Sequence, residues 1–248
     1  MRKCSFLVLF VLTLGLAACI MHKALPSRPA TAGPEVFELR LREGLALLTQ
    51  KEYGKAAAEF QAAESLNPNS VRVHNYLGLC HFQQKDYDPA LMEFQKAAEL
   101  DPSFATAYNN MGGIYSLRLQ FDKAEAMYKK ALSLSPEMIS ADYSLGMLLS
   151  NLGRRDEGSV YLSRGIALDP DYLEKHQEFL STFTSASFDM KEAYYAFAKA
   201  YASTGDVDKT AGYLEKAQTA GFRGWRRILK DKEFDKVRDD PKIKKFLI

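Results

Sequence analysis

The side chains best suited to chemistry in this 248-residue chain are few and far apart. His74 and His81 lie seven positions apart in a segment predicted to be helical, and Cys80 stands beside the second of them. Two helical turns separate the histidines by about 10 Å along the axis, which is too far for both to bind one zinc ion. Cys80 is expected to pack as a small buried hydrophobe. We therefore predict no metal site and no cofactor.

Motifs for covalent catalysis or phosphate binding are also missing from the sequence. It contains no glycine-rich phosphate loop and no Gly-x-Ser-x-Gly turn. The pattern described below brings no nucleophile, base and orienting group together. We expect no catalytic residue and no small-molecule substrate. An envelope enzyme would need a site hidden within residues 171–248, and it is the least favoured alternative.

Cys19 is the exception, because of the residues that precede it. Arg2 and Lys3 begin the chain, and an apolar run over 6–18 follows that is shorter than a membrane span of about 20 residues. The run ends in Leu16-Ala17-Ala18-Cys19, which resembles the lipobox of bacterial lipoproteins. The resemblance implies that residues 1–18 are a signal peptide and that the Cys19 thiol carries a lipid. The alternative is an ordinary signal peptide followed by an incidental cysteine.

Residues 19–36 form a predicted linker between that anchor and the rest of the chain. Three prolines lie among small and polar residues, so the segment is expected to be extended and solvated. Buried acyl chains would hold the protein on a membrane. Ile20, rather than an aspartate, follows Cys19, and this resembles the sorting signal of lipoproteins that are sent to the outer membrane. The expected location is the outer membrane, facing the periplasm.

The following region repeats itself with a period of about 34 residues, a length typical of stacked repeat arrays. Five slots keep this register through four copies without an insertion. Small residues in the first two slots let two helices approach closely, a bulky residue fills the third, and proline ends the second helix. The slots are Gly44, Gly78, Gly112, Gly146; Ala56, Ala90, Ala124, Gly158; Phe60, Phe94, Tyr128, Leu162; Ala63, Ala97, Ala131, Gly165; Pro68, Pro102, Pro136, Pro170.

This pattern resembles the tetratricopeptide repeat family over residues 37–170. The resemblance implies an all-α fold, a superhelix or α-solenoid of antiparallel helix pairs that cover one another's apolar faces. The fourth copy departs from the pattern at Gly158, Leu162 and Gly165. Because glycine inside a helix costs roughly 0.8–1 kcal/mol against alanine, this copy is expected to be the softest.

The stride breaks after Pro170. We predict a helix and loop over 171–190, including a helix over 171–184, and a capping box formed by Asp189 and Glu192. A fifth, degenerate repeat is predicted over 191–220, displaced from the earlier register by the length of this inserted helix and loop. Residues 221–248 are rich in aromatic and charged residues and predict a helical cap on the last repeat. The acids of Arg238-Asp239-Asp240-Pro241 are expected to be helix N-caps.

The charge balance argues against a nucleic-acid partner. The formal net charge is +2, and without Arg2 and Lys3 the chain holds 31 basic and 31 acidic residues. Binding to phosphate backbones favours a clear basic surplus. Partners are instead expected to be protein or peptide segments, with membrane contact through the lipid.

The first helix of each pair is expected to line a concave groove. Asn75, Asn109 and Tyr143 share one slot in three repeats, and a row of amides could bond an extended backbone. The alternative is that these asparagines bond only to neighbouring helices. Some members of the family bind a C-terminal carboxylate with lysine and arginine side chains on these helices. This chain has Leu41, Leu45, Thr106 and Asn110 at the corresponding positions. The predicted groove comprises Asn75, Tyr76, Leu79, Phe82, Asn109, Asn110, Tyr143 and Met147.

Taken together, these features predict a membrane-anchored, protein-binding scaffold of the bacterial envelope. Two specific versions stay open. One resembles pilotin-type lipoproteins that assist the assembly of a pilus or secretin. The other resembles lipoprotein adaptors for outer-membrane assembly or for cell-wall machinery.

Overall fold

The computed structural model describes residues 33–176 and 189–247, and in these ranges it contains helices and no strand. The predicted signal peptide, Cys19 and most of the linker lie outside the described residues, as do residues 177–188. The first helix begins at Pro34, slightly earlier than the repeat pattern suggested. Proline is tolerated there because a helix's first turn leaves its N–H groups unpaired anyway.

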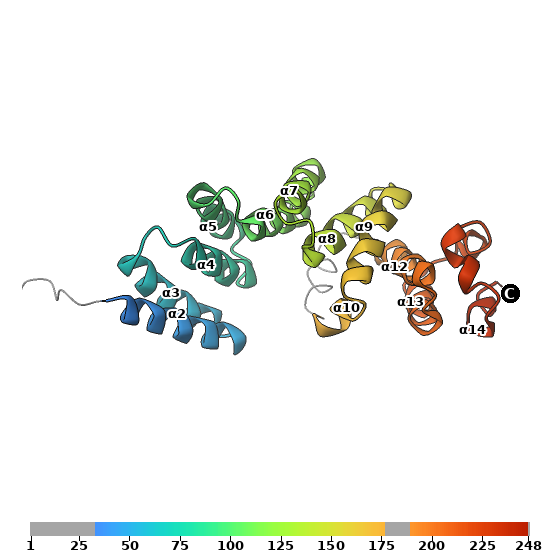
Figure 1. Cartoon of the computed structure of the whole chain (residues 1–248), viewed down its shortest axis with the longest axis horizontal. Coiled ribbons are helices and arrows are strands. Elements are labelled where there is room, and N and C mark those ends of the chain that lie inside the picture. Colours follow the sequence, from blue (N-terminus) through green and yellow to red (C-terminus); the bar gives the residue numbers. More distant parts are fainter. Residues whose placement is uncertain (1–32, 177–188, 248) are drawn as a thin grey trace, which may run out of the picture.

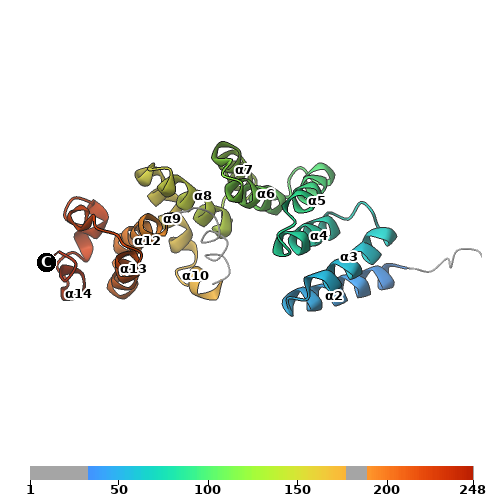
Figure 2. The same ribbon diagram turned by 180° about the vertical axis from the view of Figure 1, so that it is seen from behind.

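Four antiparallel helix pairs follow one another along an arched path (Figure 1), and the view from behind shows the same succession (Figure 2). Contacts are densest within each pair and continue from the second helix of one pair to the first helix of the next. The pairs are α2 (Pro34–Thr49) with α3 (Tyr53–Leu66), α4 (Val71–Gln83) with α5 (Tyr87–Leu100), α6 (Ala105–Leu117) with α7 (Phe121–Leu134), and α8 (Ile139–Asn151) with α9 (Arg155–Leu168).

Each pair closes on a contact between glycine and a bulky side chain. A methyl group added to Gly112 would lie 2.5 Å from a ring carbon of Tyr128, and one added to Gly44 would lie 2.5 Å from a ring carbon of Phe60. In the fourth pair Gly146 faces Leu162 instead. The glycine slot and the aromatic slot of the repeat are therefore the two halves of one contact, and each bulky side chain is fully buried.

The turns inside the pairs share one backbone device. Lys51, Lys85, Leu119 and Gly153 occupy equivalent positions in the four repeats, and all have positive φ, at 62°, 66°, 58° and 80°. The next residue donates its N–H to a carbonyl of the helix just completed, for example from Gln120 to Tyr115 at 2.9 Å. This is the left-handed helix ending that redirects the chain into the second helix.

The chain changes character after α9. A single helical turn, α10 (Tyr172–Lys175), ends before His176, so the helix predicted over 171–184 is wrong at His176, and its residues 177–184 lie outside the described residues. A fifth pair follows, α12 (Met190–Thr204) and α13 (Val207–Thr219). The predicted capping box is also wrong. Asp189 makes no side-chain cap bond, because its carboxylate pairs with Lys191 at 3.1 Å.

The C-terminal segment packs on the fifth pair as short turns of helix. These are η1 (Trp225–Arg227), η2 (Lys232–Lys236) and α14 (Pro241–Lys244). Asp240 caps α14 by accepting from the Lys242 N–H at 2.8 Å, which confirms one of the expected N-caps. Its buried apolar side chains join the core of α12 and α13, and they are Phe222, Ile228, Phe234, Val237, Ile243 and Phe246.

Candidate functional site

The predicted row of amides is interrupted at Asn75. This side chain is 6% exposed, and its Oδ1 accepts a hydrogen bond at 3.1 Å from Nδ2 of Asn110 on the next first helix. Asn109 is half-buried, and its carbonyl oxygen is buried without a hydrogen-bond partner among the described residues. The Asn75 amide therefore joins α4 to α6, as expected for an asparagine that bonds to a neighbouring helix, and its contact with a partner stays a prediction.

Tyr143 and Met147 do not line an open surface either. Both are fully buried, and the Tyr143 ring stacks on Tyr172 with centroids 5.3 Å apart and lies 5.9 Å from Phe197. Every residue of α8 from Ala141 to Ser150 is buried. Side chains of α10 and α12 pack against α8, so the predicted groove contacts of the fourth repeat belong to the core.

The remaining predicted residues are partly open to solvent. Together with two leucines of α2 they form what we call the first-helix face, which spans the first three pairs. Its apolar members pack against the core on one side, as when Tyr76 stacks on Phe60 with centroids 5.1 Å apart. The face consists of Leu45, Leu48, Tyr76, Leu79, Phe82, Asn109 and Asn110, all of them half-buried.

The histidines and the cysteine of α4 do not form a site. His74 is buried, with Nδ1 2.8 Å from Glu93 and Nε2 2.9 Å from the carbonyl oxygen of Pro68. Burial raises the pKa of the Cys80 thiol to about 11, so the thiol stays protonated and unreactive at neutral pH. Within residues 33–176 and 189–247, no group of three or more His, Cys, Asp or Glu is placed to hold a metal ion.

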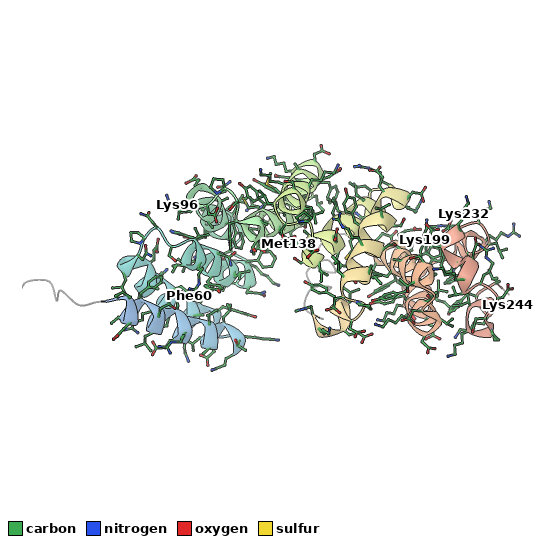
Figure 3. The ribbon with its side chains drawn as sticks, in the orientation of Figure 1. Phe60, Lys96, Met138, Lys199, Lys232 and Lys244 are labelled. Atoms are coloured by element: carbon green, nitrogen blue, oxygen red, sulfur yellow. The ribbon has the colours of Figure 1, made fainter. Side chains whose placement is uncertain are left out.

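A buried lysine is the polar feature that the sequence analysis missed. Lys199 of α12 is 5% exposed, and its Nζ lies 3.1 Å from Asp156 and 3.3 Å from Glu233, where α12 meets the C-terminal segment (Figure 3). Burial disfavours the charge, but the bond to Asp156 and the charges of Asp231 and Glu233 raise the pKa of Lys199 overall. The amine is therefore a cation and not a base at neutral pH.

This lysine belongs to a polar seam that ties the C-terminal segment to the array. The Tyr195 hydroxyl donates to Asp231 at 2.9 Å, and Glu192 pairs with Arg227 at 2.8 Å and Arg155 at 2.9 Å. The sequence did contain a signal for Lys199. When the displacement of the fifth repeat is included, Lys199 occupies the repeat position of Met147, where a charged residue is out of pattern. The seam consists of paired charges that connect the C-terminal segment to α9 and α12.

None of the helices in the described ranges is long and apolar enough to cross a membrane. The candidate site in these ranges is the first-helix face. It offers apolar side chains beside amides, which suit the binding of another polypeptide.

Comparison with known proteins agrees with the fold. Models of the tetratricopeptide repeat match residues 32–105, 74–137 and 142–172, which together exceed half of the chain. No curated protein matches it.

Solved structures show the same architecture. TTC0263, a thermophilic tetratricopeptide repeat protein of Thermus thermophilus, is 19% identical with a TM-score of 0.54, over 81% of this chain and 98% of that one. A MamA protein is 19% identical with a TM-score of 0.51, over 80% of this chain and 96% of that one. At such identities the likeness concerns the fold alone. From the repeat models and the helix pairs together, the chain belongs to the tetratricopeptide repeat family.

Proposed function

We propose that this protein holds a segment of a partner protein across the first-helix face while a lipid on Cys19 keeps it at the bacterial envelope. Tetratricopeptide repeat proteins are protein-binding scaffolds in general. The finer part of the proposal, the face and the anchor, rests on the residues of this chain.

The observation that carries the binding proposal is the half-exposed apolar strip on α2 and α4. Leu45 and Leu79 are equivalent in the repeat, and so are Leu48 and Phe82, so four apolar side chains recur at a regular spacing. An amphipathic helix or an extended segment binds through such regularly spaced anchors. Asn109 and Asn110 on α6 continue the face with amide groups, which can bond to backbone atoms.

The burial of α8 limits how far such a segment extends. Because Tyr143 and Met147 are covered by α10 and α12, the open face ends at α6. A partner segment is thus expected to contact the first three pairs. Substitutions in the fourth pair are expected to act through stability.

The envelope part of the proposal rests on the sequence. Leu16-Ala17-Ala18-Cys19 supplies the acylation motif, and the proline-containing residues 20–33 supply the spacer. The expected location is the outer membrane, on its periplasmic side. In this arrangement the linker holds the arched array away from the bilayer, where its first-helix face stays accessible.

Site-specific photocrosslinking in cells tests the binding face. A photoreactive residue at Leu79 or Phe82 is expected to capture the same partner protein. The matched control is Met92 on α5, which is 68% exposed and lies outside the face. Capture of the same partner with equal yield from Met92, or no capture from either face position, would overturn the proposal.

Fractionation tests the anchor separately. Cys19→Ser removes the thiol that the lipid would occupy, so the variant is expected to leave the membrane fraction. Tight membrane association of the variant, resistant to high salt, would show that Cys19 is not the point of attachment.

A further inference from the structure

Charge is distributed unevenly between the repeat array and its C-terminal segment. Residues 221–248 hold ten Lys and Arg against five Asp and Glu, whereas residues 19–220 hold 21 against 26. The segment therefore carries +5 and the preceding chain −5. The near-neutral total conceals a basic end on an acidic array.

About half of the basic side chains in the segment are already paired. Arg227, Arg238, Lys242, Lys244 and Lys245 each contact a carboxylate. Lys236 donates to the carbonyl oxygen of Ser203 at 2.8 Å. Arg223 donates to the adjacent carbonyl oxygen of Phe222 at 3.4 Å. Apart from Lys236, the exposed cations of this segment without a carboxylate partner among the described residues are Arg223, Arg226, Lys230 and Lys232.

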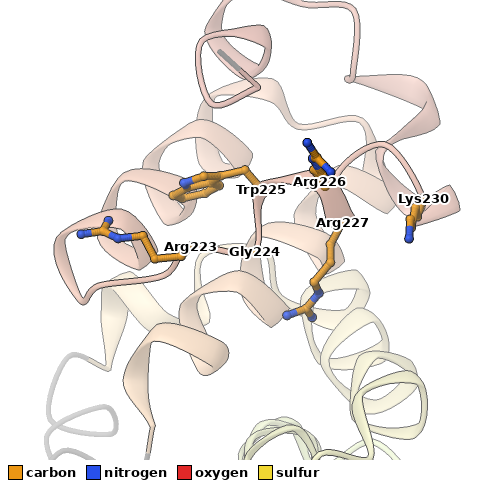
Figure 4. A pocket seen from close by; sticks show the side chains of 6 residues that line it. All are labelled: Arg223, Gly224, Trp225, Arg226, Arg227 and Lys230. Carbon is orange, nitrogen blue, oxygen red and sulfur yellow. The ribbon is translucent and has the colours of Figure 1, made fainter.

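Three of these unpaired cations line one hollow. It has a volume of about 420 Å³ and is lined by Arg223, Gly224, Trp225, Arg226, Arg227 and Lys230, with no acidic residue among them. In Figure 4, Arg223 and Trp225 lie on one side of Gly224, and Arg226, Arg227 and Lys230 lie on the other.

The floor of the hollow is held in place by the core. A methyl group on Gly224 would lie 2.9 Å from the Phe222 ring, so the backbone passes directly over that side chain. The Trp225 ring packs against Phe222 and Phe246, with centroids 4.9 and 5.2 Å apart. Arg227 is engaged with Glu192 and lies 4.2 Å from the Tyr195 ring centre. Arg223, Arg226 and Lys230 are thus available on a fixed support.

Apolar groups accompany these cations at the surface. Leu229 is 53% exposed, next to Lys230 in the chain, and Trp225 is partly exposed. An exposed leucine next to Lys230 in the chain, and an indole in a hollow lined by arginine and lysine, match a membrane interface, where apolar groups enter the headgroup region and cations meet lipid phosphates.

We propose that the patch formed by Arg223, Trp225, Arg226, Leu229 and Lys230 docks on an anionic phospholipid surface. The three cations contact lipid phosphates, and Trp225 and Leu229 enter the interface. This contact is separate from the first-helix face and does not depend on a lipid at Cys19. It gives the array a second contact with a bilayer, at the end opposite to the linker.

The chain offers a direct reporter, because Trp225 is its only tryptophan. The full-length protein is mixed with vesicles of phosphatidylglycerol and phosphatidylcholine whose acyl chains are brominated, and tryptophan fluorescence is recorded. Docking is expected to quench Trp225 on anionic vesicles and not on vesicles of phosphatidylcholine alone. An N-terminal anchor by itself holds the protein to both vesicles but does not bring Trp225 to the acyl chains.

Two triple variants that each remove three positive charges distinguish docking through the patch from attraction by the overall positive charge of the segment. Replacing Arg223, Arg226 and Lys230 by glutamine is expected to weaken docking on the order of a hundredfold. The control replaces Lys242, Lys244 and Lys245, which are exposed and paired, and it is expected to change docking little. Equal loss in both variants, or equal quenching on neutral vesicles, would overturn the proposal.

Leu229→Ser distinguishes a membrane from a soluble anion. Removing the apolar contact is expected to weaken vesicle docking by roughly tenfold. Inorganic phosphate, which shares the headgroup's anionic chemistry, is expected to shift Trp225 fluorescence only weakly. A patch that responds to inorganic phosphate or to a soluble acidic protein as strongly as to vesicles, and that ignores Leu229→Ser, is not a membrane-docking surface.

Discussion

His74 Nδ1 lies 2.8 Å from a carboxylate oxygen of Glu93, and the same pairing occurs one repeat earlier, where Arg40 donates to Glu59 at 2.8 Å. The other ring nitrogen of His74 faces the carbonyl oxygen of Pro68. Both neighbours are hydrogen-bond acceptors, so each ring nitrogen of His74 faces an oxygen atom. One buried side chain thereby joins α4 to α5 and to the turn before α4.

We predict that His74→Ala lowers the free energy of unfolding by about 2–3 kcal/mol, since it leaves Glu93 unpaired and opens a cavity. His74→Tyr is the matched variant, because Tyr108 occupies this slot in the next repeat and donates to the Pro102 carbonyl at 3.3 Å. Tyrosine is expected to recover roughly half of the loss. Urea denaturation measures the free energy of unfolding of both variants. If His74→Tyr lost as much stability as His74→Ala, the bond to Pro68 would contribute nothing.

The regular part of the fold was predictable because each slot of the repeat performs one packing task. Gly112 and Tyr128 come from different helices of a pair, yet one contact explains both, so their recurrence at a fixed stride indicates helix pairs. The residues that face away from this contact were harder to assign. Asn75 is bonded by Asn110, which stands one slot further along the next repeat, and the stride does not show such a bond.

The burial of Tyr143 could not be predicted from the repeat for a related reason. Tyr172 and Phe197, which cover it, come from segments beyond the point where the stride breaks. The seam at Lys199 likewise depends on Glu233 in the C-terminal segment, which has no counterpart in the repeats. A periodic pattern describes contacts between neighbouring repeats, and these contacts are formed by residues outside it.

Two adjacent glycines of α6 are predicted to respond in opposite directions to alanine. At Gly112 the new methyl group would overlap the Tyr128 ring, so Gly112→Ala is expected to destabilise by about 1–3 kcal/mol. At Gly113 nothing lies within 4 Å of the added methyl group, and alanine favours the helix by about 1 kcal/mol. Thermal unfolding of the two variants gives the comparison. A loss of stability in both would show that the open space at Gly113 is occupied.

Leu119 is predicted to be a strained residue. Its φ of 58° is left-handed, which costs an L-residue roughly 1–2 kcal/mol, and the equivalent residue in the next repeat is Gly153. Leu119→Gly is therefore expected to raise the free energy of unfolding by about 1 kcal/mol, even though 52% of the leucine is exposed. Gly153→Ala is the reciprocal test and is expected to lower stability by a similar amount. Guanidinium denaturation that shows no gain for Leu119→Gly would mean that the leucine side chain offsets the strain.

Alkaline pH is predicted to weaken the third pair through Tyr128. Burial raises the pKa of this hydroxyl to about 12, against about 10 in an unfolded chain. Between these values the folded state keeps a proton that the unfolded state has lost. Stability therefore falls as the pH rises, by up to about 1.4 kcal/mol per pH unit.

The comparison with Tyr128→Phe isolates this effect. At pH 7 phenylalanine is expected to be less stable by about 1 kcal/mol, since it loses the contact of the hydroxyl with Ser116 at 3.2 Å. From pH 10 upward the difference is expected to shrink and to reverse near pH 11. Denaturation curves at pH 7, 10 and 11 measure it, and a difference that stays constant with pH would contradict the assignment to Tyr128.

Loss of a C-terminal core residue is predicted to affect one end of the array and to spare the other. Phe234 is fully buried, with its ring centre 5.8 Å from that of Tyr195 on α12. Phe234→Ala is expected to cost about 3–5 kcal/mol locally. Stability in a repeat array is transmitted between neighbours, so hydrogen exchange should accelerate in α12, α13 and the C-terminal segment. The amides of α2 to α5 should keep their protection, and Leu229→Ala, at a 53% exposed residue of the same segment, should change neither region. Uniform acceleration along the chain would instead show that the five pairs unfold as one cooperative unit.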